Sequence, residues 1–107
     1  MQVIVTPEMI NTRYAMNAGV GEEAAIHFVS PEPIALDDYI VAEGNTDTFA
    51  GEEVLIFHGA QQFGTIAQAG NFSADKEAAS TSRDFVLLAS GPSSHILSDV
   101  RIVVTKP

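Results

Sequence analysis

A dense group of oxygen-bearing side chains lies between two apolar runs of the sequence. Residues 43–53 read EGNTDTFAGEE, which combines carboxylates, an amide and hydroxyls. Calcium prefers such oxygen ligands. The acids available for an irregular calcium loop are Asp37, Asp38, Glu43, Asp47 and Glu52. An EF-hand loop needs Gly at its sixth position and an acid at its twelfth, but counting from Glu43 places Thr48 and Val54 there. We therefore predict a solvated turn between strands, with a calcium loop as the alternative.

Nitrogen ligands and catalytic groups give weaker signals. The three histidines, His27, His58 and His95, match the number of a zinc site but form no local pair at the usual spacings. Ser94, His95 and Asp99 are close in sequence, yet a catalytic triad is defined by geometry and oxyanion donors, which sequence proximity does not supply. We expect structural histidines, no cofactor and no catalytic residues.

Aromatic side chains offer another chemistry, the stacking of a sugar or other small ligand. The chain has no Trp, and several Phe residues lie inside apolar runs. Phe49 and Phe63 lie in turn-rich surroundings and, with Tyr39, are the aromatic residues we select as ligand contacts. A carbohydrate- or small-ligand-binding module, calcium-assisted if the acidic loop binds the ion, is therefore the alternative function.

The elements that would position these residues are mostly strands. Short apolar runs alternate with clusters of Gly, Pro, Asn and Ser along the whole chain, which is typical of a β-rich domain. We predict a single all-β domain over residues 1–107, a compact antiparallel β-sandwich or jelly-roll-like barrel. Residues 7–16 follow a capping pattern and fit a short helix, but Ile10, Tyr14 and Met16 also share one strand parity, so a strand is the alternative. Residues 73–79 fit one or two helical turns capped by Ser73, or a surface loop.

Several of the predicted strands do not alternate between apolar and polar residues. In residues 54–57 and 85–89 both strand parities are apolar, and residues 102–104 are similar. A sheet covered on one face should alternate, so we predict that a second face is covered by another copy or another protein. The alternative is that curved strands and long loops of the same domain cover these residues. The predicted interface residues are Val54, Ile56, Val86, Leu88, Arg101 and Val103.

Size and charge restrict the partners. A chain of 107 residues with net charge -9 has five scattered basic residues and no Cys. Nucleic-acid binding needs clustered Lys or Arg, and a membrane span needs about 20 apolar residues, so we predict neither partner. No signal peptide is visible after Met1, and we expect a protein that is cytoplasmic when made.

These features together favour a non-enzymatic structural or assembly protein that packs against itself or a larger protein. Its size, acidic surface and β architecture are similar to those of small phage head-decoration proteins. The resemblance implies a viral capsid decoration or tail-associated subunit located in the virion. The identity of the partner, the symmetry and the strand order stay open at this point.

Overall fold

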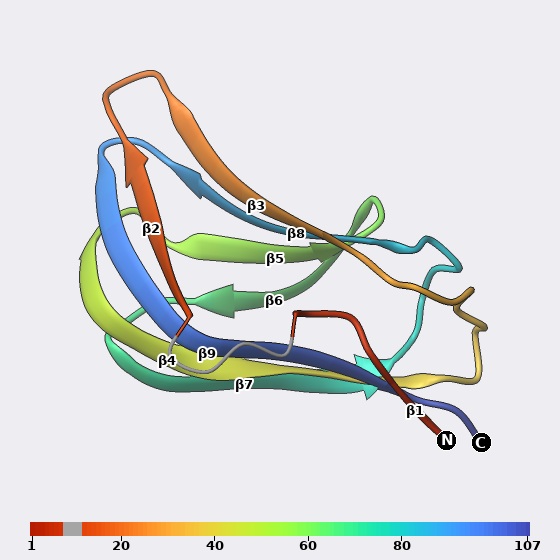
Figure 1. Ribbon diagram of the computed structural model, residues 1–107. Helices are drawn as coiled ribbons and strands as arrows, with labels where there is room; N and C mark the ends of the chain where they lie inside the picture. The colour runs from red at the N-terminus through yellow and green to blue at the C-terminus, as the bar shows by residue number, and fades with distance from the viewer. Residues whose placement is uncertain (8–11) are drawn as a thin grey trace.

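The apolar runs form β-strands in the computed structural model, which describes residues 1–7 and 12–107 (Figure 1). The strands are β1 (Gln2–Ile4), β2 (Arg13–Ala18), β3 (Glu23–Val29), β4 (Tyr39–Gly51), β5 (Val54–His58), β6 (Gln61–Ile66), β7 (Gly70–Glu77), β8 (Asp84–Ser90) and β9 (Ser93–Thr105). Many of the connections are tight and contain Gly, such as the turn at Gly59 between β5 and β6, where φ is +59°.

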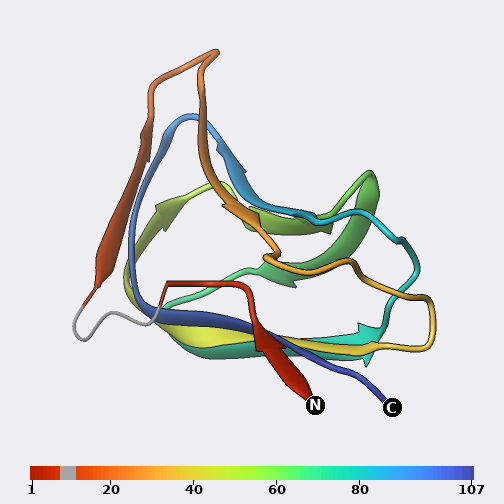
Figure 2. The ribbon, with the colours of Figure 1, turned by 45° about the vertical axis from the view of Figure 1, so that its right-hand side comes forward.

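The strands pair in two antiparallel sheets that pack face to face. Sheet A has the order β1-β9-β4-β7, and β2 pairs with the first half of β9 on the same side as β1. Sheet B has the order β3-β8-β5-β6. The predicted antiparallel β-sandwich is confirmed, and the alternative of a closed barrel is not, because each sheet keeps two edges. The β2–β3 hairpin projects beyond the rest of the sandwich in two views (Figures 1 and 2).

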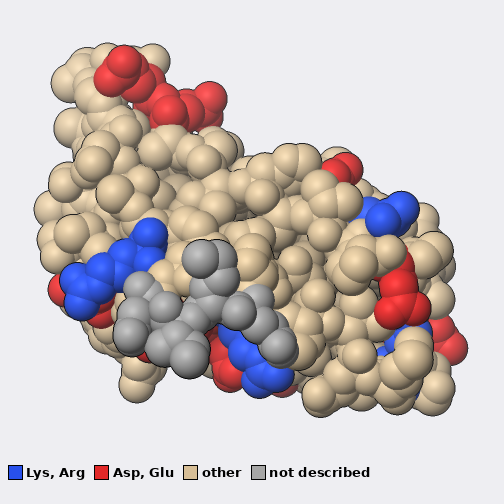
Figure 3. Space-filling view, in the orientation of Figure 1, with Lys and Arg blue, Asp and Glu red and all other residues tan. Residues whose placement is uncertain are grey.

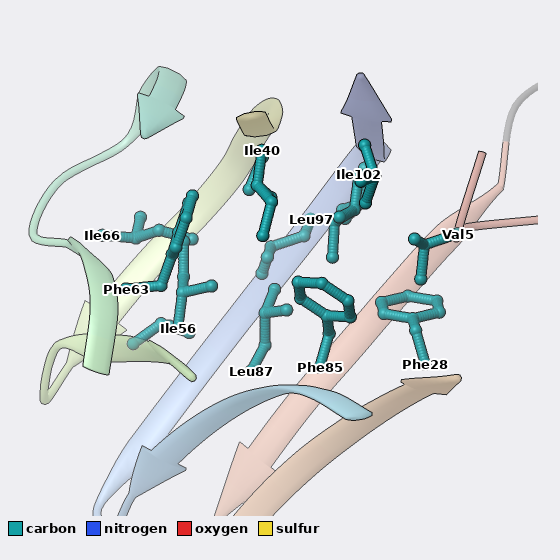
Figure 4. Close-up of a cluster of buried hydrophobic side chains, with 14 of the residues drawn as sticks. Val5, Phe28, Ile40, Ile56, Phe63, Ile66, Phe85, Leu87, Leu97 and Ile102 are labelled. Atoms are coloured by element: carbon teal, nitrogen blue, oxygen red, sulfur yellow. The ribbon is translucent and has the colours of Figure 1, made fainter. Parts of the chain in front are cut away.

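The core lies between the sheets and follows the period of two. Along β8, Phe85, Leu87 and Ala89 are buried, while the residues between them are partly exposed. The side chains of Phe85 and Leu87 point toward Ile40 and Leu97 from the opposite sheet (Figure 4). One side of sheet B therefore forms the core, and the apolar residues of the other parity are left facing outward.

The acidic stretch that we predicted as a turn is part of the long strand β4. Tyr39–Gly51 is continuous and pairs with β9 along its length and with β7 along its first part. Register shifts between Glu43 and Asn45 and between Thr46 and Thr48 let the strand bend. The turn prediction was wrong for residues 43–51, because polar residues on a solvent-facing, bulged strand look like a turn in sequence. The chain reverses only at Gly51, with φ of +106°.

The predicted short helix is absent from residues 1–7 and 12–107. Residues 73–77 belong to β7 and pair with β4, and residues 13–16 belong to β2 and pair with β9. Strand pairing has overridden the local capping signals. Residues 8–11 of the first helix prediction lie outside the described part of the chain. No helix among the described residues is long and apolar enough to cross a membrane.

Leu87 and Leu88 give a direct test of this sandwich. Leu87 is 1% exposed and Leu88 is partly exposed on the outer side. Leu87→Ala should lower the free energy of unfolding by about 2–5 kcal/mol, because it leaves a cavity, and Leu88→Ala by about 1 kcal/mol or less. Urea denaturation followed by circular dichroism measures both. Equal losses would contradict the assignment of Leu88 to the outer face.

Candidate functional site

The outer face of sheet B carries a continuous group of apolar side chains. Leu55 on β5 lies opposite Leu88 on β8, and Phe57 lies opposite Val86. All four are partly exposed, and they alternate along each strand with core residues such as Leu87. Directly opposed residues on a sheet are close enough for their side chains to touch. We call these four residues the outer apolar face.

The outer apolar face is bounded by residues of the two neighbouring strands. On β3, Ala25 lies opposite Leu88 and His27 lies opposite Val86. On β6, Thr65 lies opposite Leu55. The His27 ring contacts the Asp84 carboxylate at 2.9 Å, with both side chains more than half exposed. Val29 at the end of β3 adds a further apolar side chain that is 51% exposed.

The charges around this face are acidic. The four strands of sheet B contain no Lys or Arg. Glu23 on β3 and Asp84 on β8 share the outward parity, and Glu53 directly before β5 continues the parity of Leu55. A space-filling view shows acidic side chains at the tip of the β2–β3 hairpin (Figure 3). The face therefore combines an apolar centre with a negative rim.

The predicted interface residues divide between the core and two different surfaces. Val86 and Leu88 lie on the outer apolar face and are partly exposed, so their role as contacts stays a prediction. Val54 and Ile56 are 0% and 1% exposed and pack in the core, so their prediction as contacts was wrong: they have the inward parity of β5.

The residues that the sequence analysis missed are Leu55 and Phe57, which have the opposite parity. Both parities of β5 are apolar, and hydrophobicity alone could not choose between them. The acids before β5 gave no signal, because Glu52 and Glu53 are both exposed and have opposite parities.

Arg101 and Val103 lie on β9, in the other sheet. Val103 is 8% exposed and lies opposite Ile4 and Val41, so it offers little surface to a partner. Arg101 is exposed on the outside of sheet A. The six predicted residues therefore do not form one surface.

The aromatic residues proposed for a ligand groove are not brought together. Phe63 is buried to 7% exposure, with the Lys76 ammonium 5.3 Å from its ring centroid. Phe49 is partly buried and stacks on His95 at 4.4 Å between centroids. Tyr39 is exposed at the opposite end of β4 from Phe49, which places the two about 30 Å apart along the strand. A hydrogen bond from Tyr39 to Asp75 raises the pKa of this phenol.

A hollow on the outside of sheet A gathers polar side chains instead. It has a volume of about 580 Å³ and lies at the bulge where Gly44 on β4 passes β9. Asp99 adopts a left-handed conformation there, with φ of +54°. The polar side chains around it are Glu43, Asn45, Asn71, Ser73, Asp99 and Arg101. Two carboxylates, two amides and a guanidinium can together bind a neutral ligand with several hydroxyl groups.

The acids proposed for calcium do not converge. No group of three or more His, Asp or Glu side chains that could hold a metal ion occurs among the residues described. Asp38 accepts hydrogen bonds from the Ala35 amide and the Lys106 ammonium. Asp47 bonds to Asn45 and Ser98, while Glu43 borders the hollow. Asp37 and Glu52 are exposed. Strand β4 separates these residues, because an extended strand spreads its acids along its length.

Two histidines have structural roles. His95 is 0% exposed, its Nδ1 accepts the Ala50 amide and its Nε2 donates to the Glu52 carbonyl at 2.7 Å. His58 is 2% exposed and its Nε2 contacts the Ser82 carbonyl at 2.7 Å. The Ser94 hydroxyl donates a hydrogen bond to Asn17 Oδ1. Ser94 and His95 therefore do not form a hydrogen-bonded pair of the triad type.

Comparison with known proteins finds no matching family model, no matching curated protein and no matching solved structure.

The buried ion pair of Asp38 and Lys106 predicts an acid-dependent loss of stability. The Ala35 amide and then Lys106 hold the pKa of Asp38 below its usual 3.8. Because the folded-state pKa is the lower one, the contribution is complete above about pH 4 and is lost as pH falls through the folded pKa. We expect Asp38→Asn to lower the melting temperature at pH 7, with a smaller difference from wild type well below pH 4. Asp37→Asn, at an exposed neighbour, is the matched control and should change little at either pH. A difference for Asp38→Asn that does not depend on pH would contradict the role of its charge.

Proposed function

We propose that the protein is a non-enzymatic assembly subunit that docks on a larger protein through the outer apolar face of sheet B. The observation that carries the proposal is the row of Leu55, Phe57, Val86 and Leu88 on a solvent-facing sheet. A monomer does not need apolar side chains there, because the core is already formed on the opposite side. Contiguous outward apolar residues are characteristic of protein-binding surfaces.

The charge around the face indicates what it docks on. Two copies packed face to face would bring the same acidic rim, Glu23, Glu53 and Asp84, against itself. A surface with an apolar centre and a basic rim would instead be complementary to it. We therefore assign the face to a foreign protein with Lys or Arg around an apolar depression.

The energy of this contact is modest. The part of the four side chains still exposed is worth on the order of 2–4 kcal/mol when buried, and association itself costs free energy. A single face supports weak docking, so repeated copies on one scaffold would be needed for stable attachment. A viral capsid or tail, with its many equivalent positions, is a setting that suits such a subunit, in line with the similarity to phage decoration proteins.

Site-specific crosslinking tests the docking face. A benzophenone amino acid replaces Phe57, and in the control it replaces Ser73, which is exposed on sheet A. In cells that make the protein, we expect irradiation to join position 57 to one larger protein, and position 73 to give no such product. The purified partner should bind with an affinity that falls with rising salt, because its basic rim is screened.

The matched variant for this experiment is Leu88→Asp. It should weaken binding at least about tenfold while the melting temperature stays close to wild type, because Leu88 is outside the core. Equal crosslinking from positions 57 and 73, or binding that is unaffected by Leu88→Asp, would overturn the proposal.

A second candidate function is binding of a small polyhydroxylated ligand in the hollow on sheet A. This candidate is supported by the polar side chains that border the hollow, which are Glu43, Asn71, Asp99 and Arg101. These side chains make no hydrogen bond to another described residue. Their donors and acceptors are thus free for a ligand.

Nuclear magnetic resonance titration with a panel of mono- and disaccharides tests the second function. We expect saturable shifts of the backbone amides near Asn71 and Arg101, and we expect Asn71→Ala to abolish them. Asn17→Ala, on the exposed side of β2, is the control and should leave them intact. Shifts that do not saturate, or that persist in Asn71→Ala, would count against the hollow as a sugar site.

A further inference from the structure

One edge of sheet B is open. β3 is the terminal strand of that sheet and pairs only with β8. Within the described part of the chain, no strand pairs with its other edge. An unpaired edge presents a row of amide and carbonyl groups that another strand can bind.

The hydrogen-bond pattern identifies which groups face this open edge. The Ser30 amide donates to the Arg83 carbonyl, and the Gly91 amide donates to the Glu22 carbonyl. In antiparallel sheets, hydrogen-bonded and non-hydrogen-bonded residue pairs alternate. These two bonds therefore show which residues of β3 are hydrogen-bonded to β8. Bonding to β8 therefore falls on the even-numbered residues of β3. The amide and carbonyl groups of Glu23, Ala25, His27 and Val29 point away from β8, toward the open edge.

The open edge lacks the usual protection against pairing. Natural edge strands are protected by Lys, Pro, bulges or inward charges. The terminal strand of sheet A, β7, carries Asp75, Lys76 and Glu77. The other edge of sheet B, β6, is approached by β7, since Lys76 Nζ donates to the Gln62 carbonyl at 3.2 Å. Strand β3 has no Lys, Pro or register shift, and its middle reads AAIHFV.

We propose that β3 pairs antiparallel with β3 of a second copy, with the two Ile26 residues facing each other at a two-fold axis. This register is the one that uses all four outward groups: Glu23 opposes Val29 of the second copy, and Ala25 opposes His27. Ile26 is partly exposed at the edge of the core, and the pairing covers it with its symmetry mate. Two four-stranded sheets become one continuous sheet, so two outer apolar faces lie on the same side.

The symmetry of the register favours a second copy over an unrelated strand. About Ile26, the four outward-facing residues of β3 pair with the same four residues of the other copy, and the two partly exposed Ile26 side chains cover each other. The pairing also places Glu23 of one copy opposite Val29 of the other, on the same face as Asp84. Salt at physiological strength screens this repulsion between two chains of net charge -9.

Sedimentation velocity at physiological ionic strength, from low micromolar to millimolar protein, tests the pairing. We expect wild type to shift from monomer to dimer mass across this range. Ala25→Pro should raise the dimer dissociation constant at least about tenfold, because each copy loses a donor that faces the open edge. The monomer should keep its circular dichroism spectrum and melting temperature, because this amide makes no bond to β8. Ala25→Val keeps the amide and is the control that should dimerise like wild type.

Charge reversal tests the register. Glu23→Arg should tighten the dimer by a few-fold, because in this register Glu23 lies on the same face as Asp84 of the other copy. A wild type that stays monomeric at millimolar concentration, or an Ala25→Pro variant that dimerises like wild type, would overturn the edge pairing. A Glu23→Arg variant that dimerises more weakly than wild type would overturn the register about Ile26.

This inference rests on the proposed assembly function but fails separately from it. Leu88→Asp should abolish docking on the larger protein and leave the dimer, because Leu88 lies on the face and not at the open edge. Ala25→Pro should abolish the dimer and leave docking of the monomer, weakened only by the loss of a second attachment point. Loss of the dimer in Leu88→Asp would mean that the copies associate through the face instead of through β3, which would also overturn the inference.

Discussion

The register between β5 and β8 decides which apolar side chains form the core and which are left for a partner. Both strands are apolar on both parities, and a shift by one residue would exchange the two faces. Hydrophobicity alone does not choose between these arrangements. The choice is made by polar groups: His58 is buried where its ring stacks on Phe85 at 4.5 Å and contacts the Ser82 carbonyl. A shift of β5 would bury Glu53 and a shift of β8 would bury Asp84, and burial of either unpaired charge is strongly unfavourable.

This register has a cost and a benefit for the free subunit. Apolar residues on a solvent-facing sheet contribute less to stability than they would in the core, and they favour nonspecific association. The net charge of -9 opposes nonspecific association in solution, and the acids nearest to the face discourage face-to-face packing. In the proposed docking the same charges favour a basic partner surface, so solubility and specificity would have one physical origin.

The sequence predicted the β-sandwich and the outward position of Val86 and Leu88, because turn residues and apolar runs report strands directly. It did not predict that Leu55 and Phe57 face outward and that Val54 and Ile56 face the core. The outward parity of a strand cannot be identified where both parities are apolar. It also did not predict β4, in which the polar residues at 43–51 resemble a turn until pairing with β9 is known. Pairing partners come from distant parts of the chain, and local patterns contain no information about them. The open edge of β3 could not be predicted from the sequence either, because an edge strand is identified only by the strand order.

The proposed edge pairing and the proposed face docking would reinforce each other. One outer face offers only a modest apolar contact, which is too little for stable attachment of a lone subunit. Pairing along β3 places two such faces on one side of a continuous sheet, so that binding of the first face raises the local concentration of the second. The edge pairing itself needs no extra apolar surface, because it uses backbone groups that already face outward. An unprotected edge and an apolar face each favour nonspecific association of a monomer. In the proposed arrangement they would be the two contacts of one assembly.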